Sequence, residues 1–405
     1  MQEIDFVIPW VDGSDSEWRK QKALYSNDSA AIIHQDNGEE RYRDWEILRY
    51  WFRGVEKYAP WVRRIHFITC GHVPEWLNLN HPKLNFVRHE DYIPRKWLPV
   101  FSSRPIELNV FRIEGLAEKF VFFNDDIFIN APVKPEDFFV DGLPCMTAAL
   151  SAGPPTMGRD EVAMIMNDVL TVVEHFSFKE GLKRDFRKWL SPRLGAKLLM
   201  KTLLLIPFMR YTGFHECHTA NSYLKSTFIE VWDKERAQLE DTCSHRFRQR
   251  TDVNQWLMEY WQLASGKFYP RSPKFFAGYG GDKGVMLSYA ADDIRRQMHK
   301  VICVNDSGEF THEKLESLSR EIRGAFGEAL PEKSVVKIGG WITSHRPAKT
   351  KRGDFMAFVT LEYSAESIEV VIFPNVYQTC VNYLAADSGW IVEGKTDFSK
   401  GKVEI

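Results

Sequence analysis

Hydrophobic residues in the first third of the chain fall into short runs that predict β-strands. These runs are rich in valine, isoleucine and phenylalanine, and they cover residues 4–11, 64–69, 84–88 and 119–129. Segments of helical periodicity separate them. This alternation is typical of a mostly parallel α/β sheet with helices on both faces, which is the fold class that the pattern predicts.

Apolar stripes at helical spacing mark the predicted helices. One stripe begins at Trp45 and ends before Pro60, and a second covers residues 106–116. The pair Thr251-Asp252 is expected to cap an aromatic-rich helix. A further helix is predicted over residues 311–329, after a short strand at 300–304.

The pattern changes twice along the chain. From about 150 to 214 it weakens into a less regular helical insert, with a basic stretch (179–193) and an apolar piece (203–209) too short to span a bilayer. After Ser334, short β-type runs separated by turns predict a small all-β barrel. We therefore expect two domains, residues 1–334 and 335–405.

Composition restricts the partners and the compartment. The net charge of −2 argues against general nucleic-acid binding, so a nucleic-acid partner is not expected. Six scattered cysteines without a C-x-x-C pair favour a reducing cytoplasm, and the chain begins directly with a strand. The basic and apolar segment 179–210 leaves open a peripheral contact with the inner face of the membrane or with a capsule-assembly partner. Nothing in the composition indicates an oligomeric state.

Polar residues follow two of the predicted strands. They are Asp12, Gly13, Ser14 and Asp15 after the first strand, and Asn124, Asp125 and Asp126 after the fourth. If both strands are parallel neighbours, these residues meet at the carboxyl edge of the sheet, where α/β proteins bind ligands. Adjacent carboxylates favour a cation, and ligands that are oxygen atoms favour Mg²⁺ or Mn²⁺, the usual partners of diphosphates.

Each of these motifs also has a purely structural interpretation. The first is a good turn sequence, and the second fits a tight turn in a hairpin of residues 120–129. Asn305 and Asp306 follow the strand at 300–304 and are either further metal ligands or a turn.

Histidines and arginines supply the other candidate chemistry. His215 and His218 lack a second ligand pair for structural zinc, so they are candidates for acid–base work or for a structural role. Side chains suited to phosphate binding lie near predicted helix starts: Ser102, Ser103, Arg104, Arg248 and Arg250. For any single arginine, a solvated surface position is the alternative.

Taken in order, four blocks of this sequence resemble the conserved regions of the Stealth family. The first is IDFVIPWVDGSDSEW (residues 4–18), and the second, at 41–129, contains RYRDWEILRYWFRGVEKYAPWVRRIHFITCG, VPEWLNL, FSS and FVFFNDDIFI. The third, at 215–268, is similar more loosely, and VICVND (301–306) resembles the fourth. The family includes bacterial capsular-polysaccharide phosphotransferases and the animal enzyme that places N-acetylglucosamine-1-phosphate on lysosomal glycoproteins.

The resemblance implies transfer of a sugar-1-phosphate from a nucleotide sugar, with UDP as the expected nucleotide, to a hydroxyl of a glycan acceptor. It places Asp12 and Gly13 near the donor, and it makes His215 or His218 the base and Arg248 a phosphate ligand. It also makes Asp125, Asp126, Asn305 and Asp306 the candidates for binding Mg²⁺. An ordinary metal-dependent glycosyltransferase that releases nucleoside diphosphate is the alternative.

The C-terminal segment departs from this family. Residues 335–401 resemble the OB-fold module of the bacterial DNA polymerase III alpha subunit, through VKIGG (336–340), TKRGDFMAFVTL (350–361) and residues 368–374. Both a complete and an incomplete barrel are compatible with this segment. OB folds bind oligonucleotides or oligosaccharides, so nucleic-acid binding through this tail is a further alternative function.

Overall fold

The computed structural model describes most of the chain. The described residues are 3–26, 42, 45–152, 160–215, 218–280, 284–305, 311–332, 335–350, 353–364, 366–385 and 387–396. They form two compact units, residues 1–329 and 330–405.

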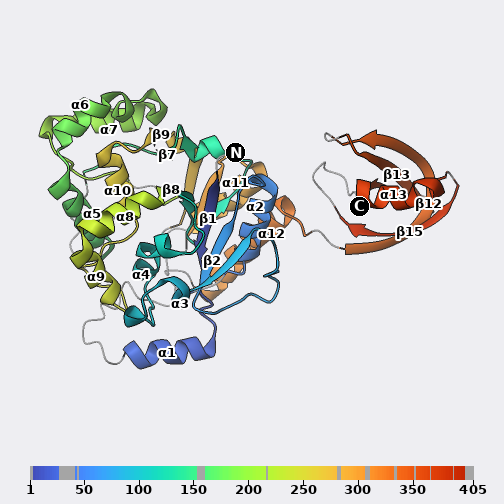
Figure 1. The fold of residues 1–405 in the computed structure, drawn as a ribbon, viewed down its shortest axis with the longest axis horizontal. Helices are drawn as coiled ribbons and strands as arrows, with labels where there is room; N and C mark the ends of the chain where they lie inside the picture. Colours follow the sequence, from blue (N-terminus) through green and yellow to red (C-terminus); the bar gives the residue numbers. More distant parts are fainter. Residues whose placement is uncertain are drawn as a thin grey trace. The chain divides into compact units, whose positions relative to one another are not determined.

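A five-stranded sheet lies at the centre of the first unit (Figure 1). Its strands, in spatial order, are β3 (Leu84–Arg88), β2 (Ile65–Thr69), β1 (Ile4–Pro9), β4 (Lys119–Phe122) and β8 (Asn221–Leu224). The first four are parallel to one another, and β8 pairs antiparallel with β4. The prediction of a mostly parallel α/β sheet is confirmed, and the strands that precede the two polar motifs are direct neighbours.

Aromatic side chains pack helices against both faces of this sheet. On one face Phe6 of β1 contacts Trp51 of α2 (Leu48–Tyr58), with ring centroids 6.5 Å apart. On the other face Phe120 of β4 contacts Phe228 of α8 (Lys225–Lys234) at 5.5 Å. Burial of these large rings contributes to the hydrophobic stabilisation of the sheet.

The first unit also contains a three-stranded sheet. It consists of β10 (Phe276–Tyr279), β11 (Val301–Val304) and β5 (Ile127–Ile129). The predicted strand run 119–129 is therefore two strands in two sheets, so the hairpin interpretation of residues 120–129 is wrong. Residues 124–126 instead form the crossing between the sheets, because β5 pairs with β11 and β4 pairs with β1 and β8.

Two helix predictions need correction. The stripe over residues 106–116 is split into α4 (Ser103–Leu108) and a 3-10 turn, η4 (Val110–Arg112). The helix ends there because the Asn109 side-chain amide, at 2.8 Å, donates a hydrogen bond to the Pro105 carbonyl. Helix α10 (Trp256–Ser265) begins after Gln255, and Thr251-Asp252 does not cap it. The Asp252 carboxylate instead binds Arg104 and His245.

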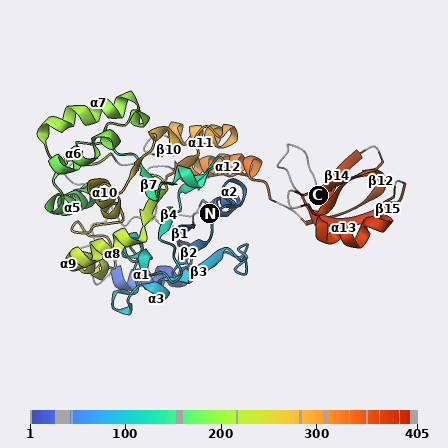
Figure 2. The same cartoon turned by 45° about the horizontal axis from the view of Figure 1, so that its top comes forward.

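The described part of the segment that the sequence left irregular contains three α-helices. These are α5 (Asp160–His175), α6 (Phe178–Trp189) and α7 (Gly195–Leu205), and α7 continues into the 3-10 turn η7 (Ile206–Phe208). Figures 1 and 2 both show α6 and α7 at the periphery of the first unit. Within the described residues, no helix has the length and apolar character needed to cross a membrane.

The remaining elements of the first unit are shorter or peripheral. They are α1 (Ser16–Ser26), α3 (His89–Tyr92), η3 (Arg95–Trp97), η5 (Pro135–Asp137), β6 (Phe139–Val140), β7 (Leu143–Met146), η6 (Pro192–Leu194), α9 (Arg236–Ser244), β9 (Tyr269–Pro270), η8 (Pro273–Phe275), α11 (Gly284–Arg296) and α12 (His312–Ala329). Helix α12 matches the prediction for residues 311–329.

The second unit has its own hydrophobic core. Its antiparallel sheet has the order β14 (Glu366–Ile372), β13 (Phe355–Tyr363), β12 (Val335–Lys349) and β15 (Gly389–Lys395). Helix α13 (Pro374–Cys380) and the 3-10 turn η9 (Val381–Tyr383) connect β14 to β15. Ile342, Val359 and Val370 are buried within it. The predicted strands are present as an antiparallel sheet, but α13 shows that the segment is not all-β, and a closed barrel is not seen among the described residues.

Candidate active site

Asp126 lies where the five-stranded sheet meets the sheet of β10, β11 and β5. Its Oδ2 atom accepts hydrogen bonds from Asn305 Nδ2 at 2.8 Å and from the Cys303 thiol at 3.3 Å. The Asp126 carbonyl also accepts from the Val304 backbone N–H at 2.8 Å. The pairing of β5 with β11 therefore places residues 126 and 305 together, although they are distant in sequence.

His218 contacts the same cluster. Its Nε2 atom is 2.6 Å from the Asn124 amide nitrogen and 3.6 Å from Asp126 Oδ1, while its Nδ1 atom is 3.8 Å from Cys303 Sγ. The Asn124 oxygen accepts from Gln255 Nε2 at 3.4 Å, which orients the amide so that its nitrogen donates to His218. An Nε2 atom that accepts this bond leaves the ring proton on Nδ1.

The cluster has the donor atoms that a divalent cation requires. Asp126 Oδ1 is buried and has no hydrogen-bond partner, although buried carboxylate oxygens are normally paired. Ligand atoms of Asp126, His218 and Cys303 lie within 4.8 Å of one another. Asp125 lines the same cavity and adds a second carboxylate. Asp306, also predicted as a ligand, lies outside the described residues.

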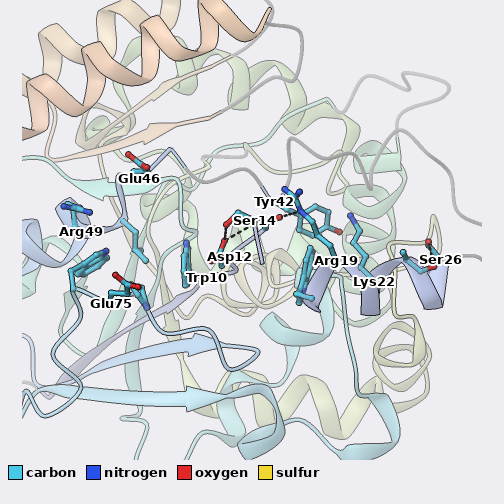
Figure 3. A pocket seen from close by; sticks show the side chains of 16 residues that line it. Trp10, Asp12, Ser14, Arg19, Lys22, Ser26, Tyr42, Glu46, Arg49 and Glu75 are labelled. Atoms are coloured by element: carbon cyan, nitrogen blue, oxygen red, sulfur yellow. Dashed lines mark hydrogen bonds between the residues drawn. The ribbon is translucent and has the colours of Figure 1, made fainter. Parts of the chain in front are cut away.

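Two adjoining cavities open around this edge of the sheet. The smaller, of about 240 Å³, is lined by residues that include Asn124, Asp125, Asp126, His218 and Asn305. The larger, of about 850 Å³, is shown in Figure 3. Trp10, Trp18, Tyr42 and Leu48 line both cavities, so the two adjoin each other.

The Asp-Gly-Ser-Asp motif shapes the larger cavity. The Asp12 carboxylate accepts hydrogen bonds from the backbone N–H and the hydroxyl of Ser14 (Figure 3). Burial is the largest single influence on the Asp12 pKa and raises it, but the hydrogen bonds from Ser14 and the smaller influences together outweigh burial, so the pKa is lowered. Asp15 caps α1 by accepting from Trp18 N at 2.6 Å. A Cβ atom on Gly13 would lie 1.8 Å from the Tyr42 carbonyl oxygen. The absence of a side chain at Gly13 thus lets the Tyr42 backbone, rather than a ligand, approach closely.

The serine and arginine candidates separate into two groups. Arg248 and both serines line the smaller cavity, where Arg248 Nη2 is 3.4 Å from Ser103 Oγ and Ser102 caps α4. Arg104 does not line either cavity; it is buried and donates to Asp252 Oδ2 at 2.7 Å. Arg250 is exposed and likewise lines neither cavity.

The structure also separates the two histidines. His215 lines neither cavity, and its backbone N–H donates to Ala149. Burial lowers the pKa of the His215 imidazole, and Lys201 and Lys197 lower it further. Only His218 of the pair is placed beside Asp126.

Sequence reasoning missed two residues, one beside the smaller cavity and one in its lining. Cys303 contacts Asp126 and His218, and burial together with the Asp126 charge raises the pKa of its thiol far above the ordinary value. Glu107 lines the cavity and accepts from the backbone of Gln255 at 3.4 Å. The signal for Glu107 was present, since it is a charged residue between the apolar Ile106 and Leu108.

Comparison with solved structures gives only weak likenesses. A galactosyltransferase LgtC in complex with donor and acceptor sugar analogs aligns over 82% of this chain and 97% of its own, with 10% identity and a TM-score of 0.36. The bifunctional glycosyltransferase WbbM aligns over 82% of this chain and 50% of its own, with 11% identity and a TM-score of 0.35.

Comparison by sequence is far more specific. Stealth protein conserved region 1 matches residues 2–30 and conserved region 2 matches residues 41–145. A capsular polysaccharide phosphotransferase WcwK of Streptococcus pneumoniae is 41% identical, covering 82% of this chain and 98% of its own. A receptor polysaccharide phosphotransferase WefC of Streptococcus gordonii is also 41% identical, covering 84% and 100%. An exopolysaccharide phosphotransferase cps2G of Lactiplantibacillus plantarum is 38% identical, covering 82% and 95%. The chain therefore belongs to the Stealth family, together with these bacterial polysaccharide phosphotransferases.

Proposed function

We propose that the protein transfers a sugar-1-phosphate from a nucleotide sugar, UDP-linked by preference, to a hydroxyl of a glycan acceptor in capsular or other cell-surface polysaccharide synthesis. The observation that carries this proposal is the identity of about 40% with polysaccharide phosphotransferases over nearly their full length. The cluster around Asp126 supplies a site of suitable chemistry. A cytoplasmic location is part of the proposal.

The cavities suggest how the donor is held. Asp12 and Gly13 line the larger cavity, so we assign the nucleotide to that side. Trp10, which lines both cavities, offers a flat surface for a base or sugar. The diphosphate then reaches Arg248, whose guanidinium can bind two phosphate oxygens.

In the proposed reaction, an acceptor hydroxyl attacks the β-phosphorus of the donor. A new oxygen–phosphorus bond forms, the bond to the α-phosphate oxygen breaks, and nucleoside monophosphate leaves while the sugar's anomeric bond stays intact. His218 takes the hydroxyl proton on Nε2, where the acceptor hydroxyl replaces the Asn124 amide as the hydrogen-bond donor. Arg248 stabilises the charge that develops on the phosphoryl oxygens.

A magnesium ion fits the residues present. Asp125, Asp126 and Asn305 would hold it, and the unpartnered Asp126 oxygen is the observation that favours a cation there. When bound, Mg²⁺ would neutralise part of the diphosphate charge. The thiol of Cys303 is a poor ligand for this ion, so we assign it only to orienting Asp126.

The deciding experiment is to incubate the protein with UDP-sugars, Mg²⁺ and an oligosaccharide acceptor, and to separate the nucleotide products. We expect UMP together with a new phosphodiester signal in phosphorus NMR. Release of UDP without a phosphodiester would overturn the proposal and favour an ordinary glycosyltransferase. Reactions without acceptor control for simple hydrolysis of the donor.

We also propose that the second unit is an incomplete OB-like barrel and that the catalytic domain spans residues 1–334. Support for the barrel comes from β12, which pairs with both β13 and β15, and from α13 between β14 and β15. The relatives leave 16–18% of this chain unmatched, about the share that residues 330–405 contribute. A gel shift with single-stranded DNA that depends on these residues would favour nucleic-acid binding.

A further inference from the structure

Residues 178–210 carry a concentration of positive charge. They contain nine lysines and arginines but only two acidic residues, whereas the whole chain has a net charge of −2. Seven of the nine basic residues are exposed: Lys179, Lys183, Arg184, Arg187, Arg193, Lys197 and Arg210. The cations therefore face solvent on α6, η6 and α7 and just after η7.

Helix α7 is apolar on two sides. Its inner side buries Leu198 and Thr202, whereas Met200, Leu203 and Leu204 face solvent at the spacing of one helical stripe. Leu204 is 68% exposed. The exposed stripe continues beyond the helix, and we define the apolar ridge as Met200, Leu203, Leu204, Phe208 and Met209.

One of these cations, Lys197, lies on the same helix as the apolar ridge. Lys197 precedes Met200 by one helical turn and Leu204 by two turns, so these three side chains share one side of α7. Isolated exposed apolar residues are ordinary, but a contiguous group marks a surface that contacts something else. The occupant must accept both large apolar side chains and a surplus of positive charge.

We propose that the apolar ridge and its flanking cations dock onto the surface of an anionic lipid bilayer. The ridge would enter the boundary between headgroups and acyl chains, and the lysines and arginines would pair with anionic headgroups. A second copy of the chain fits less well, because a symmetric contact would bring the same cations together. The inference goes beyond the proposed reaction and does not depend on it.

The test is flotation of the full chain with vesicles. We expect the protein to float with vesicles that contain phosphatidylglycerol, to bind pure phosphatidylcholine vesicles weakly, and to lose binding at high salt. The double variant Met200→Ser/Leu204→Ser should bind about tenfold less. The variant Lys183→Glu/Lys197→Glu should lose its preference for phosphatidylglycerol.

Ile229→Ser is the matched control, since Ile229 is an exposed apolar residue on another helix, α8, and should leave binding unchanged. Circular dichroism and thermal melting of each variant establish that it is folded. Equal binding by the ridge variant and the wild type, or no binding by the wild type, would refute the proposal. So would a dimer, seen by light scattering, that the ridge variant dissociates while vesicle binding is absent.

Discussion

The Asp126 carboxylate combines one well-bonded oxygen with one buried oxygen that lacks a partner. Replacing it with asparagine keeps the size of the side chain but removes the charge that a cation requires. We expect Asp126→Asn to lower kcat by about 100-fold or more with little change in melting temperature. Nucleotide release at several Mg²⁺ concentrations measures this effect.

Asp233→Asn is the control for that variant, because Asp233 is an exposed acid on α8 and should keep full activity. Unchanged turnover of the Asp126 variant would show that the reaction does not use this carboxylate.

Gly13 is fixed by a steric constraint. Because the Tyr42 carbonyl occupies the space of a Cβ atom, Gly13→Ala should displace the Tyr42 backbone, destabilise the protein by about 1–3 kcal/mol and raise the KM for the donor. Gly324→Ala tests the general effect of such a change, since nothing lies within 4 Å of that position in α12. That control should be neutral or slightly stabilising. A Gly13 variant with wild-type stability and KM would contradict the steric argument.

Asp5 is a buried acid at the start of β1 and is separate from the acids at the strand ends. Burial alone would raise its pKa, but hydrogen bonds from His66 and Arg63 and from the backbone of Ala117 lower it below 3.8. Asp5→Asn should therefore cost about 2–4 kcal/mol at neutral pH, measured by urea unfolding.

The pH dependence of this effect has a definite sign. A lowered folded pKa means that the charged carboxylate stabilises the protein above pH 3.8 and that this contribution is lost as the pH falls through the folded pKa. The difference in unfolding free energy between the wild type and Asp5→Asn should shrink below about pH 4. A difference that stays constant there would show that Asp5 is not the group responsible.

At the scale of elements, the pair Arg104 and Asp252 joins the start of α4 to the loop that contains Arg248. The two side chains are almost fully buried, and Arg104 also donates to the Gln249 carbonyl at 2.7 Å. Arg104→Met should destabilise the protein by about 3–5 kcal/mol, because it leaves the buried Asp252 carboxylate with only His245 as a basic partner. Adding Asp252→Asn should recover part of that loss, which thermal unfolding of the single and double variants measures. Strictly additive losses would contradict the pairing.

Elements were predictable where the local pattern was unambiguous. Strands β1, β2 and β3 follow from short runs rich in apolar residues, and the parallel pairing of β1 with β4 brought the motifs to one edge as expected. The division of residues 119–129 was not predictable, because both halves are apolar and the partner of β5 lies near residue 302. The choice between His215 and His218 depends on the loop between them and β8, which no periodicity describes.

At the scale of the whole molecule, the two units have separate hydrophobic cores. The core of the second unit is made of residues between 338 and 392, so it needs none of the α/β unit's side chains. A chain that ends after Glu332 should therefore fold, with a melting temperature near that of the wild-type α/β unit, and keep its phosphotransferase activity. Calorimetry and nucleotide release test this expectation. Aggregation or loss of turnover would show that the second unit contributes to the first.

The position of β11 has a consequence for how the protein is made. This strand lies between β5 and β10 and carries the residues that contact Asp126, yet it is synthesised about 170 residues after β5. A ribosome has thus produced nearly all of the α/β unit before the ligand cluster can assemble. Chains that terminate before residue 301 should be inactive toward nucleotide sugars, even where β1 to β4 have already paired. Activity of a nascent chain would therefore indicate that translation has passed β11.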